Sequence, residues 1–305
     1  MGQSTVGSQA GVRWFQSSSI KPLTSAGQTV ARACSLSRKR LTRLMHYADT
    51  LPLTPQVGLI YGEQHYFSLL KMSLMSSTET WRRAHFMQHV LLDRLSKPRS
   101  LLEVGIGDAR LTRWLTKHFS RAVLVEPNAQ AVCQVTQQSF PHCQIDVVPG
   151  HIEDIELKQQ RFDLINLSHM LYYIPEQQWV PLIKKLYTHL KPGGKMLITL
   201  SGDQDMKGTI LNEFSTCSYD FEHFVTRLTE QVCDCAALSV SEDKLQAASL
   251  RALTEIMGFF LQQRNVVLSR DELSAFLRYT VPCQDGVYSV DTLQYFITLT
   301  KKQPH

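Results

Sequence analysis

Several features that would assign this chain of 305 residues to a familiar class are missing from it. It has no run of about 18 apolar residues, so we expect no membrane-spanning helix. Its seven cysteines form no C-x-x-C pair. The lone C-x-C of Cys233 and Cys235 follows His223 by ten residues, a spacing too wide for a zinc site. We therefore expect no bound metal, and thiols that stay reduced in the cytoplasm.

Acidic residues are missing from the first 48 positions, which hold seven basic residues. All 27 acidic residues follow this segment, so the rest of the chain is slightly negative even though the net charge is +5. Such a body has no positive excess with which to bind a polyanion, and nucleic acid is not the expected partner. The seven basic residues are Arg13, Lys21, Arg32, Arg38, Lys39, Arg40 and Arg43.

Residues 1–50 therefore form a basic segment, which is also rich in serine. We interpret it as a disordered tail. Organellar targeting by residues 1–48 is the alternative, because acid-free N-termini rich in arginine and serine are typical of transit peptides. The remaining residues, 51–305, are expected to form one domain. We expect a monomer, since no exposed heptad pattern is evident.

The rest of the chain has a clear secondary-structure rhythm. Apolar residues recur at helical spacing from Tyr61 to Leu95, which predicts two helices with a break at Ser76 and Ser77. Ser76 and Glu79 have the spacing of a capping box for the second helix. Strands are expected at 101–104, 122–126, 144–148, 162–168 and 195–201, and helices at 110–119, 128–140 and 176–190. This alternation predicts an α/β fold with a doubly wound, mostly parallel sheet.

The segment after Ser201 predicts further helices and the last strands. Residues 218–231, 242–264 and 270–279 have helical spacing, and 287–300 reads as strand residues around a short turn. We expect these last strands to complete a seven-stranded sheet. The helices would then form an insertion after the fifth strand.

A glycine-rich turn, EVGIGDA at 103–109, follows the first expected strand. It lacks the third glycine of a dinucleotide-binding fingerprint and the Gly-Lys-Ser/Thr of a Walker phosphate loop. Its glycines would let a ligand approach the backbone closely, and the start of the next helix favours a carboxylate. Glu126 ends the next expected strand, where a carboxylate can hold the two hydroxyls of a ribose.

This turn resembles the first motif of the Rossmann-like, class I S-adenosylmethionine-dependent methyltransferases. The segments VEP (125–127), VVPGHIEDI (147–155), FDLINLSHMLYYI (162–174) and LKPGGKMLITLS (190–201) match that family in order. The resemblance implies S-adenosylmethionine as cofactor, a cofactor-binding core at 99–201, lid helices at 61–98 and a substrate insertion with final strands at 202–305. The cofactor contacts that it implies are Glu103, Gly105, Gly107, Glu126, His151, the backbone of Ile152, and Ser168.

Two stretches, 66–87 and 169–177, are similar to histamine N-methyltransferases in particular. The resemblance implies that lid helices and tandem tyrosines form an amine site. His169 and Asp291 stand where that family carries glutamine and asparagine, and two tryptophans expected after Gly202 are absent. The implied substrate residues are Tyr66, Glu79, His169, Tyr172, Tyr173 and Asp291, with Phe86 and Met87 matching beside them.

Such a site would suit a cationic amine, with carboxylates from Glu79 and Asp291 and aromatic faces from the tyrosines. Methyl transfer to a neutral nitrogen depends mainly on positioning. The candidate catalytic residues are Glu79, His169 and Tyr172, with His169 able to accept a proton. The structural alternatives are that Glu79 only caps its helix, that Asp291 is a turn residue, and that Asp203 and Asp205 belong to a solvated loop.

We therefore expect S-adenosylmethionine-dependent N-methylation of a small amine or imidazole. O- or C-methylation of a small metabolite, with His169 as base, is the first alternative. An RNA methyltransferase is a further alternative, against which the charge of the body argues. So does NLSHM (166–170), which stands where an Asn/Asp-Pro-Pro-Tyr/Phe motif would be expected. A non-catalytic scaffold is the last alternative.

Overall fold

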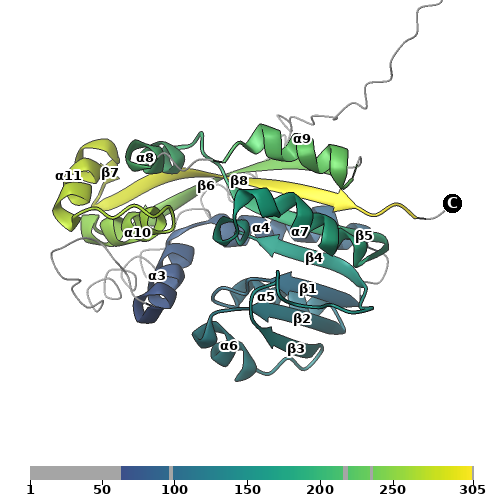
Figure 1. Ribbon diagram of the computed structural model, residues 1–305. Helices are drawn as coiled ribbons and strands as arrows, with labels where there is room; N and C mark the ends of the chain where they lie inside the picture. Colours follow the sequence, from purple (N-terminus) through teal and green to yellow (C-terminus); the bar gives the residue numbers. More distant parts are fainter. Residues whose placement is uncertain (1–62, 96–98, 216–218, 234–235, 304–305) are drawn as a thin grey trace, which may run out of the picture.

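The computed structural model describes residues 63–95, 99–215, 219–233 and 236–303 (Figure 1). The expected tail at 1–50 lies outside these residues, as do Tyr61 and the first positions of the first expected helix. The α-helices are α3 (Glu63–Ser76), α4 (Glu79–Phe86), α5 (Arg110–Leu115), α6 (Ala129–Thr136), α7 (Glu176–Thr188), α8 (Met206–Phe214), α9 (Phe221–Gln231), α10 (Leu250–Gln262) and α11 (Arg270–Thr280).

Helix α4 continues as a π-helical turn, η1 (Met87–Leu91), and a 3₁₀ turn, η2 (Leu92–Arg94). Two further 3₁₀ turns are η3 (Thr116–His118) and η4 (Leu171–Tyr173). The strands are β1 (Ser100–Val104), β2 (Arg121–Glu126), β3 (Gln144–Pro149), β4 (Phe162–Ser168), β5 (Leu190–Ser201), β6 (Ala236–Ala247), β7 (Cys283–Gln284) and β8 (Val287–Thr300).

All eight strands belong to one sheet, in the order β3-β2-β1-β4-β5-β8-β6, with the two-residue β7 paired to β8. Strands β1 to β5 are parallel to one another, whereas β8 is antiparallel to both β5 and β6. The seven long strands confirm the predicted doubly wound, mostly parallel sheet. This order brings the carboxyl ends of β1, β2 and β4 to one edge, where α/β folds bind their ligands.

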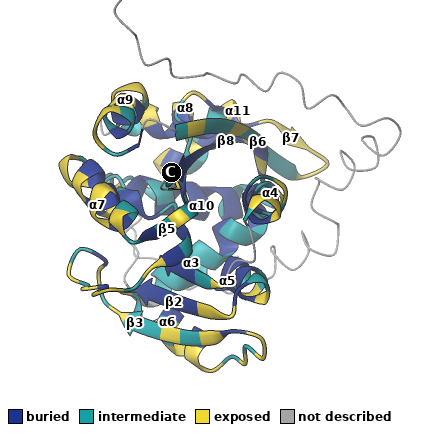
Figure 2. Ribbon diagram, turned by 90° about the vertical axis from the view of Figure 1, so that its right-hand side faces the viewer, coloured by how far each residue is buried: buried dark blue, intermediate teal, exposed yellow. Residues whose placement is uncertain are grey.

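The sheet separates two hydrophobic cores because alternate residues of a strand face opposite sides. Leu102 and Ile165 face α7 and α9 on one side. Leu101 and Leu164 face α4, α5 and α6 on the other. Figure 2 shows α7 and α9 on one side of the strands and α4 and α5 on the opposite side, with dark blue strands between them.

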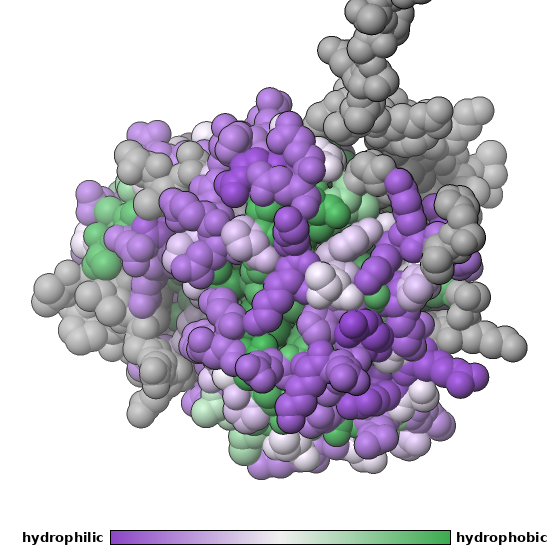
Figure 3. All heavy atoms as spheres, turned by 45° about the vertical axis from the view of Figure 1, so that its right-hand side comes forward, coloured by the Kyte–Doolittle hydropathy of each residue, from purple (hydrophilic) through white to green (hydrophobic). Residues whose placement is uncertain are grey.

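A third core lies beyond the parallel strands. Helices α3, α8, α10 and α11 pack together there with Leu245 of β6 and Val290 of β8. Nine of the thirteen residues of α10 are buried, which is typical of a helix packed on several sides. The N-terminal helix and the C-terminal insertion therefore form one body at the end of the sheet (Figure 1). The face of the molecule seen in a space-filling view is mostly hydrophilic, with small hydrophobic areas between (Figure 3).

The structure corrects three expectations about the C-terminal part. Residues 242–247 are strand β6 rather than helix, although Glu, Lys, Leu and Gln are good helix formers. Alternate residues Asp243, Leu245 and Ala247 are buried against neighbours, and twelve paired positions with β8 outweigh local preference. Strand β8 runs without a turn through 287–300. The helical insertion is split, with α8 and α9 before β6 and α10 and α11 after it.

Helices α3 and α4 are separated at Ser77, as expected, but the predicted capping box does not form. The N-cap residue of α4 is Thr78, and its side chain makes no capping hydrogen bond. The Glu79 backbone N–H instead donates to Ser77 Oγ at 3.1 Å. Thr78 N–H donates to the Lys244 carbonyl on β6. The start of α4 is thus fixed by a strand far away in sequence, and the Glu79 carboxylate is free of the capping role.

Candidate functional site

The glycine turn between β1 and α5 has a backbone that demands small residues. Gly105 and Gly107 have φ of +78° and +54°, and Ala109 follows with +59°. A Cβ on Gly105 would lie 3.3 Å from the Met170 Cβ, which is a tight contact. Left-handed backbone geometry and close approach to the segment after β4 therefore explain Gly105 physically.

Glu126 lies at the carboxyl end of β2 and contacts this turn directly. Its Oε2 accepts the Ile106 N–H at 2.9 Å, and its Oε1 accepts the Asn128 N–H at 2.8 Å. Burial raises the pKa of Glu126, and these backbone donors oppose the increase. Since each carboxylate oxygen can accept two hydrogen bonds, both oxygens retain capacity for the hydroxyls of a ribose.

Glu103 and Ser168 are joined through Asn166 inside the sheet. Asn166 Nδ2 donates to Glu103 Oε1 at 3.3 Å, and Ser168 Oγ donates to Asn166 Oδ1 at 2.8 Å. Glu103 Oε2 is buried and has no hydrogen-bond partner among the described residues. Burial raises the pKa of Glu103 to about 7. The penultimate residue of β1 thus presents an unpaired acceptor atom beneath the glycine turn.

His151 and Ile152 follow β3, on the same edge. His151 is exposed, while Ile152 is buried in the core that faces α7. His151 is close enough to Glu126 to lower the pKa of that carboxyl. The cofactor residues predicted from the sequence therefore gather at the carboxyl ends of four neighbouring strands, β1, β2, β3 and β4.

These residues fit S-adenosylmethionine. Gly105 and Gly107 place no side chain between the turn and a bound amino-acid tail, and Glu126 stands one strand away for the ribose. Glu103 offers a buried oxygen without a partner, as an ammonium group requires. Side chains at the site thus match an ammonium and a diol, both of which this cofactor carries.

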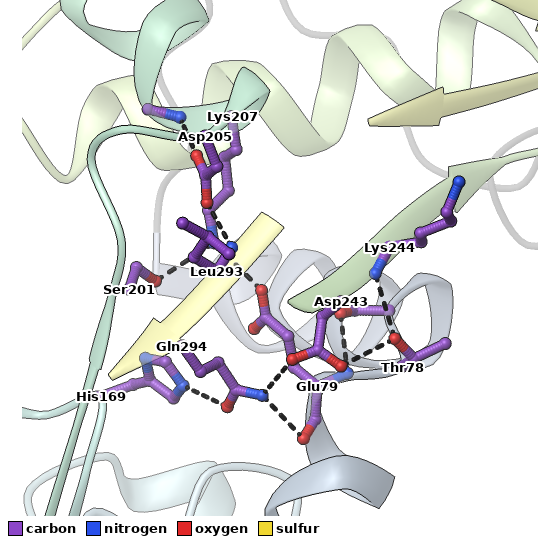
Figure 4. Close-up of polar contacts among 12 residues, drawn as sticks. Thr78, Glu79, His169, Ser201, Asp205, Lys207, Asp243, Lys244, Leu293 and Gln294 are labelled. Atoms are coloured by element: carbon purple, nitrogen blue, oxygen red, sulfur yellow. Dashed lines mark hydrogen bonds and ion pairs between the residues drawn. The ribbon is translucent and has the colours of Figure 1, made fainter. Parts of the chain in front are cut away.

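Glu79 belongs to a buried ion pair on the acceptor side of the site. Lys207 of α8 donates from Nζ to Glu79 Oε1 at 3.1 Å and to Ser201 Oγ at 3.1 Å (Figure 4). Burial alone would raise the pKa of Glu79, but the charge and hydrogen bond of Lys207 hold it at about 2. The same partnership raises the pKa of Lys207 against the effect of burial. Glu79 is therefore an ionised carboxylate whose charge is already compensated.

His169 lies beside this pair and is neutral. It has a left-handed backbone, with φ of +53°, directly after β4. Its Nε2 lies 3.2 Å from Gln294 Oε1, and its Nδ1 lies 3.5 Å from the Tyr172 hydroxyl. Burial and the nearby Arg83 charge lower the pKa of His169 to about 3.

Gln294 of β8 orders this network (Figure 4). Its Nε2 donates to the Glu79 carbonyl at 3.1 Å and to Asp243 Oδ2 at 2.8 Å. Because both partners only accept, the Gln294 oxygen must face His169, whose Nε2 then carries the proton. The Tyr172 hydroxyl accepts the Ser201 N–H and is left to donate to His169 Nδ1. Every polar atom that links these side chains has a defined role.

Tyr66 and Tyr173 meet outside this network. Their hydroxyls are 2.6 Å apart, joining α3 to the turn after β4. Tyr173 is 53% exposed, and the Tyr66 ring packs edge-on against Phe259. The structure thus brings both predicted tyrosines together, on the open side of the acceptor region.

Asp291 is not at this site, contrary to expectation. Its side chain is 63% exposed and pairs with Lys244 at 3.3 Å on the outer part of β8 and β6. The residue of β8 that reaches the site is Gln294, three positions later. The expectation that Asp205 belongs to a solvated loop is also wrong, because its side chain is buried. Its carboxylate accepts the Gly208 N–H, which caps α8, and the Leu293 N–H.

Sequence reasoning missed four buried polar residues, Arg83, Lys207, Asp243 and Gln294. A signal existed for Arg83. Glu79, Arg83 and Met87 recur every four residues, and all three are buried, so a cation stands in the inward stripe of a helix. Lys207 and Asp243 showed no comparable pattern, because neither stands in a regular stripe of apolar residues in the sequence.

Two features are absent from the part of the chain that the structure describes. No three His, Cys, Asp or Glu side chains are grouped there so that they could hold a metal ion. No helix there has both the length and the apolar composition needed to cross a membrane.

Comparison with known proteins places these observations in a family. The pattern of a family described as "Methyltransferase domain" matches residues 80–265. A malonyl-[acyl-carrier protein] O-methyltransferase from Priestia megaterium is 23% identical over 214 residues, 62% of this chain and 76% of that one. A trans-aconitate 2-methyltransferase from Deinococcus radiodurans is 24% identical over 164 residues, 51% and 61% of the two chains.

The fold is also similar to that of solved structures. A Bacillus halodurans protein described as a methyltransferase superimposes with a TM-score of 0.52 at 16% identity, over 72% of this chain and 98% of that one. The family match covers more than half of the chain, and the site fits the cofactor. The chain therefore belongs to the methyltransferase domain family and is an S-adenosylmethionine-dependent methyltransferase.

Proposed function

We propose that this enzyme transfers the methyl group to an ionised oxygen, that of a carboxylate, on a small acceptor. The observation that carries this proposal is the Glu79–Lys207 ion pair, 3.1 Å long and buried. An ammonium acceptor needs a carboxylate with uncompensated charge, and Glu79 was the residue expected to supply it. With Lys207 in place, Glu79 has no charge to spare for an amine.

The protonation state of His169 supports the same choice. A general base works best when its pKa lies near the working pH, and that of His169 is about 3. A phenol or alcohol would have to lose a proton to such a weak base. A carboxylate is already ionised at neutral pH and has no proton to lose.

Catalysis would then depend on how the chain holds its two ligands. When bound, S-adenosylmethionine supplies an activated methyl group on a sulfonium. Glu126 and the Gly105 turn would hold the nucleoside and its tail, and the network of Tyr172, His169 and Gln294 would give the acceptor side a fixed shape. Positioning of this kind accounts for much of the rate enhancement in two-substrate reactions.

Two relatives are consistent with an acid as acceptor. The names of the Priestia and Deinococcus enzymes indicate a malonyl group and trans-aconitate, respectively. Both compounds carry carboxylates. At 23% and 24% identity these names suggest a class of acceptor rather than a particular one.

N-methylation of a small amine or imidazole is the second candidate. The paired hydroxyls of Tyr66 and Tyr173 favour it, because hydroxyl groups can hydrogen-bond to a neutral amine and orient its nitrogen. The neutral His169 does not argue against a nitrogen acceptor that is itself unprotonated. In this case the tyrosines, rather than Glu79, would recognise the acceptor.

The test is incorporation of a labelled methyl group over a panel of acceptors. Malonate, trans-aconitate and other carboxylic acids form one group, and phenols, amines and imidazoles form the others. We expect label in the acids, in a product that releases labelled methanol in mild alkali, as methyl esters do. Label in an amine, stable to alkali, would support the second candidate and remove the first.

A further inference from the structure

Arg83 is a buried cation without a direct partner. It lies on α4, one turn after Glu79, and only 5% of its surface is exposed. Its Nε is buried with no hydrogen-bond partner among the described residues. Nor does any described carboxylate lie within ion-pair distance of its guanidinium. A buried charge is costly unless it is paired, so this arrangement points to a missing anion.

Arg82, the preceding residue, shows the contrast. Its side chain is 37% exposed and lies 3.9 Å from Asp243, with its guanidinium over the Trp81 ring. The half-buried Arg82 thus has an ion-pair partner, while the fully buried Arg83 has none among the described residues. A purely structural role would be expected to give Arg83 a partner of its own.

Arg83 is within electrostatic range of residues in both the glycine turn and the acceptor network. Its charge opposes protonation of His169 and lowers the pKa of Glu103, so it is near the ends of both β4 and β1. Burial lowers the pKa of Arg83 itself, and surrounding carboxylates oppose that decrease. Those carboxylates belong to Glu79, Glu103, Asp243 and Asp108.

Three of these carboxylates are engaged elsewhere. Glu79 binds Lys207, Asp243 accepts from Gln294 and Thr78, and Asp108 binds Arg110. The fourth, Glu103, accepts from Asn166 and has its pKa raised to about 7 by burial. None of them forms a direct pair with Arg83. The guanidinium therefore retains its donors for a ligand.

We propose that Arg83 is the carboxylate-binding residue of this active site. A guanidinium offers two parallel N–H donors that match a carboxylate, and such bidentate contacts are strong when water is excluded. The carboxylate would come from one of two sources, the amino-acid tail of the cofactor or the acceptor. The second source rests on the proposed function, whereas the first does not.

Binding measurements separate these sources without any turnover. We would titrate S-adenosylhomocysteine and 5′-methylthioadenosine, which lacks the amino-acid tail, into the wild type, Arg83→Met, Arg83→Lys and the exposed control Arg113→Met. If the cofactor is the source, Arg83→Met should bind S-adenosylhomocysteine about tenfold more weakly or worse, with 5′-methylthioadenosine unchanged. Arg83→Lys should lie between, and Arg113→Met should match the wild type.

If the acceptor is the source, the cofactor affinities should stay unchanged. Protein saturated with S-adenosylhomocysteine should then be stabilised against heat by malonate or trans-aconitate but not by malonamide, and Arg83→Met should lose this response. Unchanged cofactor affinity together with an unchanged response to acids in Arg83→Met would overturn the proposal.

A measurement on the wild type guards against a variant that does not fold. S-adenosylhomocysteine and its carboxamide differ only in the charged group. A carboxylate site for the cofactor predicts a preference of about tenfold or more for the acid. Equal affinities, together with no thermal response to malonate or trans-aconitate, would also overturn the proposal. Acids that bind through Arg83 but accept no label would remove the proposed function and leave this site standing.

Discussion

At the scale of single residues, the site is governed by which charges are compensated. Glu79 and Lys207 are both buried and hold one another ionised. Such a pair stabilises little compared with apolar residues of the same shape, but removal of one partner leaves an uncompensated charge in the interior. Arg83, one turn away, is in that uncompensated state until a ligand binds.

Glu79→Gln should therefore destabilise the protein strongly. We expect the free energy of unfolding to fall by about 3–5 kcal/mol, because Lys207 is left buried without a counter-charge. The double variant Glu79→Gln, Lys207→Met should recover much of this loss. Urea denaturation measures both. An equal loss in the double variant would show that the pair does not act as a unit.

The same residue gives a pH dependence. The pKa of Glu79 is about 2 in the folded protein, below its usual 4.5. Its stabilising contribution is therefore complete above about pH 4.5 and is lost as the pH falls toward 2. Between about pH 5 and 3 the free energy of unfolding should fall less steeply in Glu79→Gln than in the wild type. Parallel slopes would contradict the low pKa.

His169 should remain neutral across the physiological range. Burial and Arg83 lower its pKa to about 3, so the imidazole carbon-bound protons should show no titration between about pH 5 and 8 in NMR spectra. Spectra of His169→Gln would assign the signals. A midpoint near 6.5 for His169 would restore it as a candidate general base.

At the scale of elements, β8 joins the catalytic end of the sheet to the insertion. It pairs with β5 along Lys195 to Ser201 and with all of β6. Gln294, near its middle, donates to Asp243 of β6 and to the Glu79 carbonyl of α4. One side chain of β8 thus holds together helix α4, the edge strand β6 and His169.

Gln294→Leu should loosen this junction. It leaves the buried Asp243 oxygen and the Glu79 carbonyl without donors, and we expect a loss of about 2–5 kcal/mol in the free energy of unfolding. Lys244→Ala is the matched control on the same pair of strands, because it breaks only the exposed pair with Asp291. Chemical denaturation should show a small effect for the control, about 1 kcal/mol or less. Similar losses in both variants would contradict the role given to Gln294.

At the scale of the whole molecule, three cores meet around one site. The two cores on the faces of the sheet hold the strands that carry Glu103, Glu126 and Ser168. The third core holds α8, which carries Lys207, together with α3, which carries Tyr66. Ligands that bind between these bodies should stabilise the folded chain as a whole.

S-adenosylhomocysteine should therefore raise the melting temperature. At a concentration one hundred times its dissociation constant, a ligand adds about 2.7 kcal/mol to the free energy of unfolding. Gly105→Arg should abolish this shift, because Gly105 has φ of +78° and an added Cβ would lie 3.3 Å from the Met170 Cβ. Differential scanning fluorimetry of both proteins is the measurement. An unchanged shift in Gly105→Arg would show that the glycine turn does not bind the cofactor.

The sheet, and the place of the predicted cofactor residues at one edge of it, were predictable from sequence because each depends on neighbours along the chain. Apolar runs predicted β1, β2 and β4, and Glu126 had to end a strand that lies beside β1. The prediction failed at β6, where good helix formers are held in a strand by pairing with β8. The prediction that Asp291 belongs to the site failed for a related reason. Strand β8 continues through Asp291 and turns its side chain outward.

By itself, the sequence of this protein determined a methyltransferase sheet with a glycine turn and a carboxylate at the end of the neighbouring strand, because turns and strand ends are encoded by adjacent residues. Only the tertiary structure decided which buried charges are neutralised. Lys207 meets Glu79 across 128 positions, and Gln294 reaches the Glu79 carbonyl across 215. Burial makes an unpaired charge costly and a paired one inert. The character of the acceptor side therefore depends on contacts that no local pattern reveals.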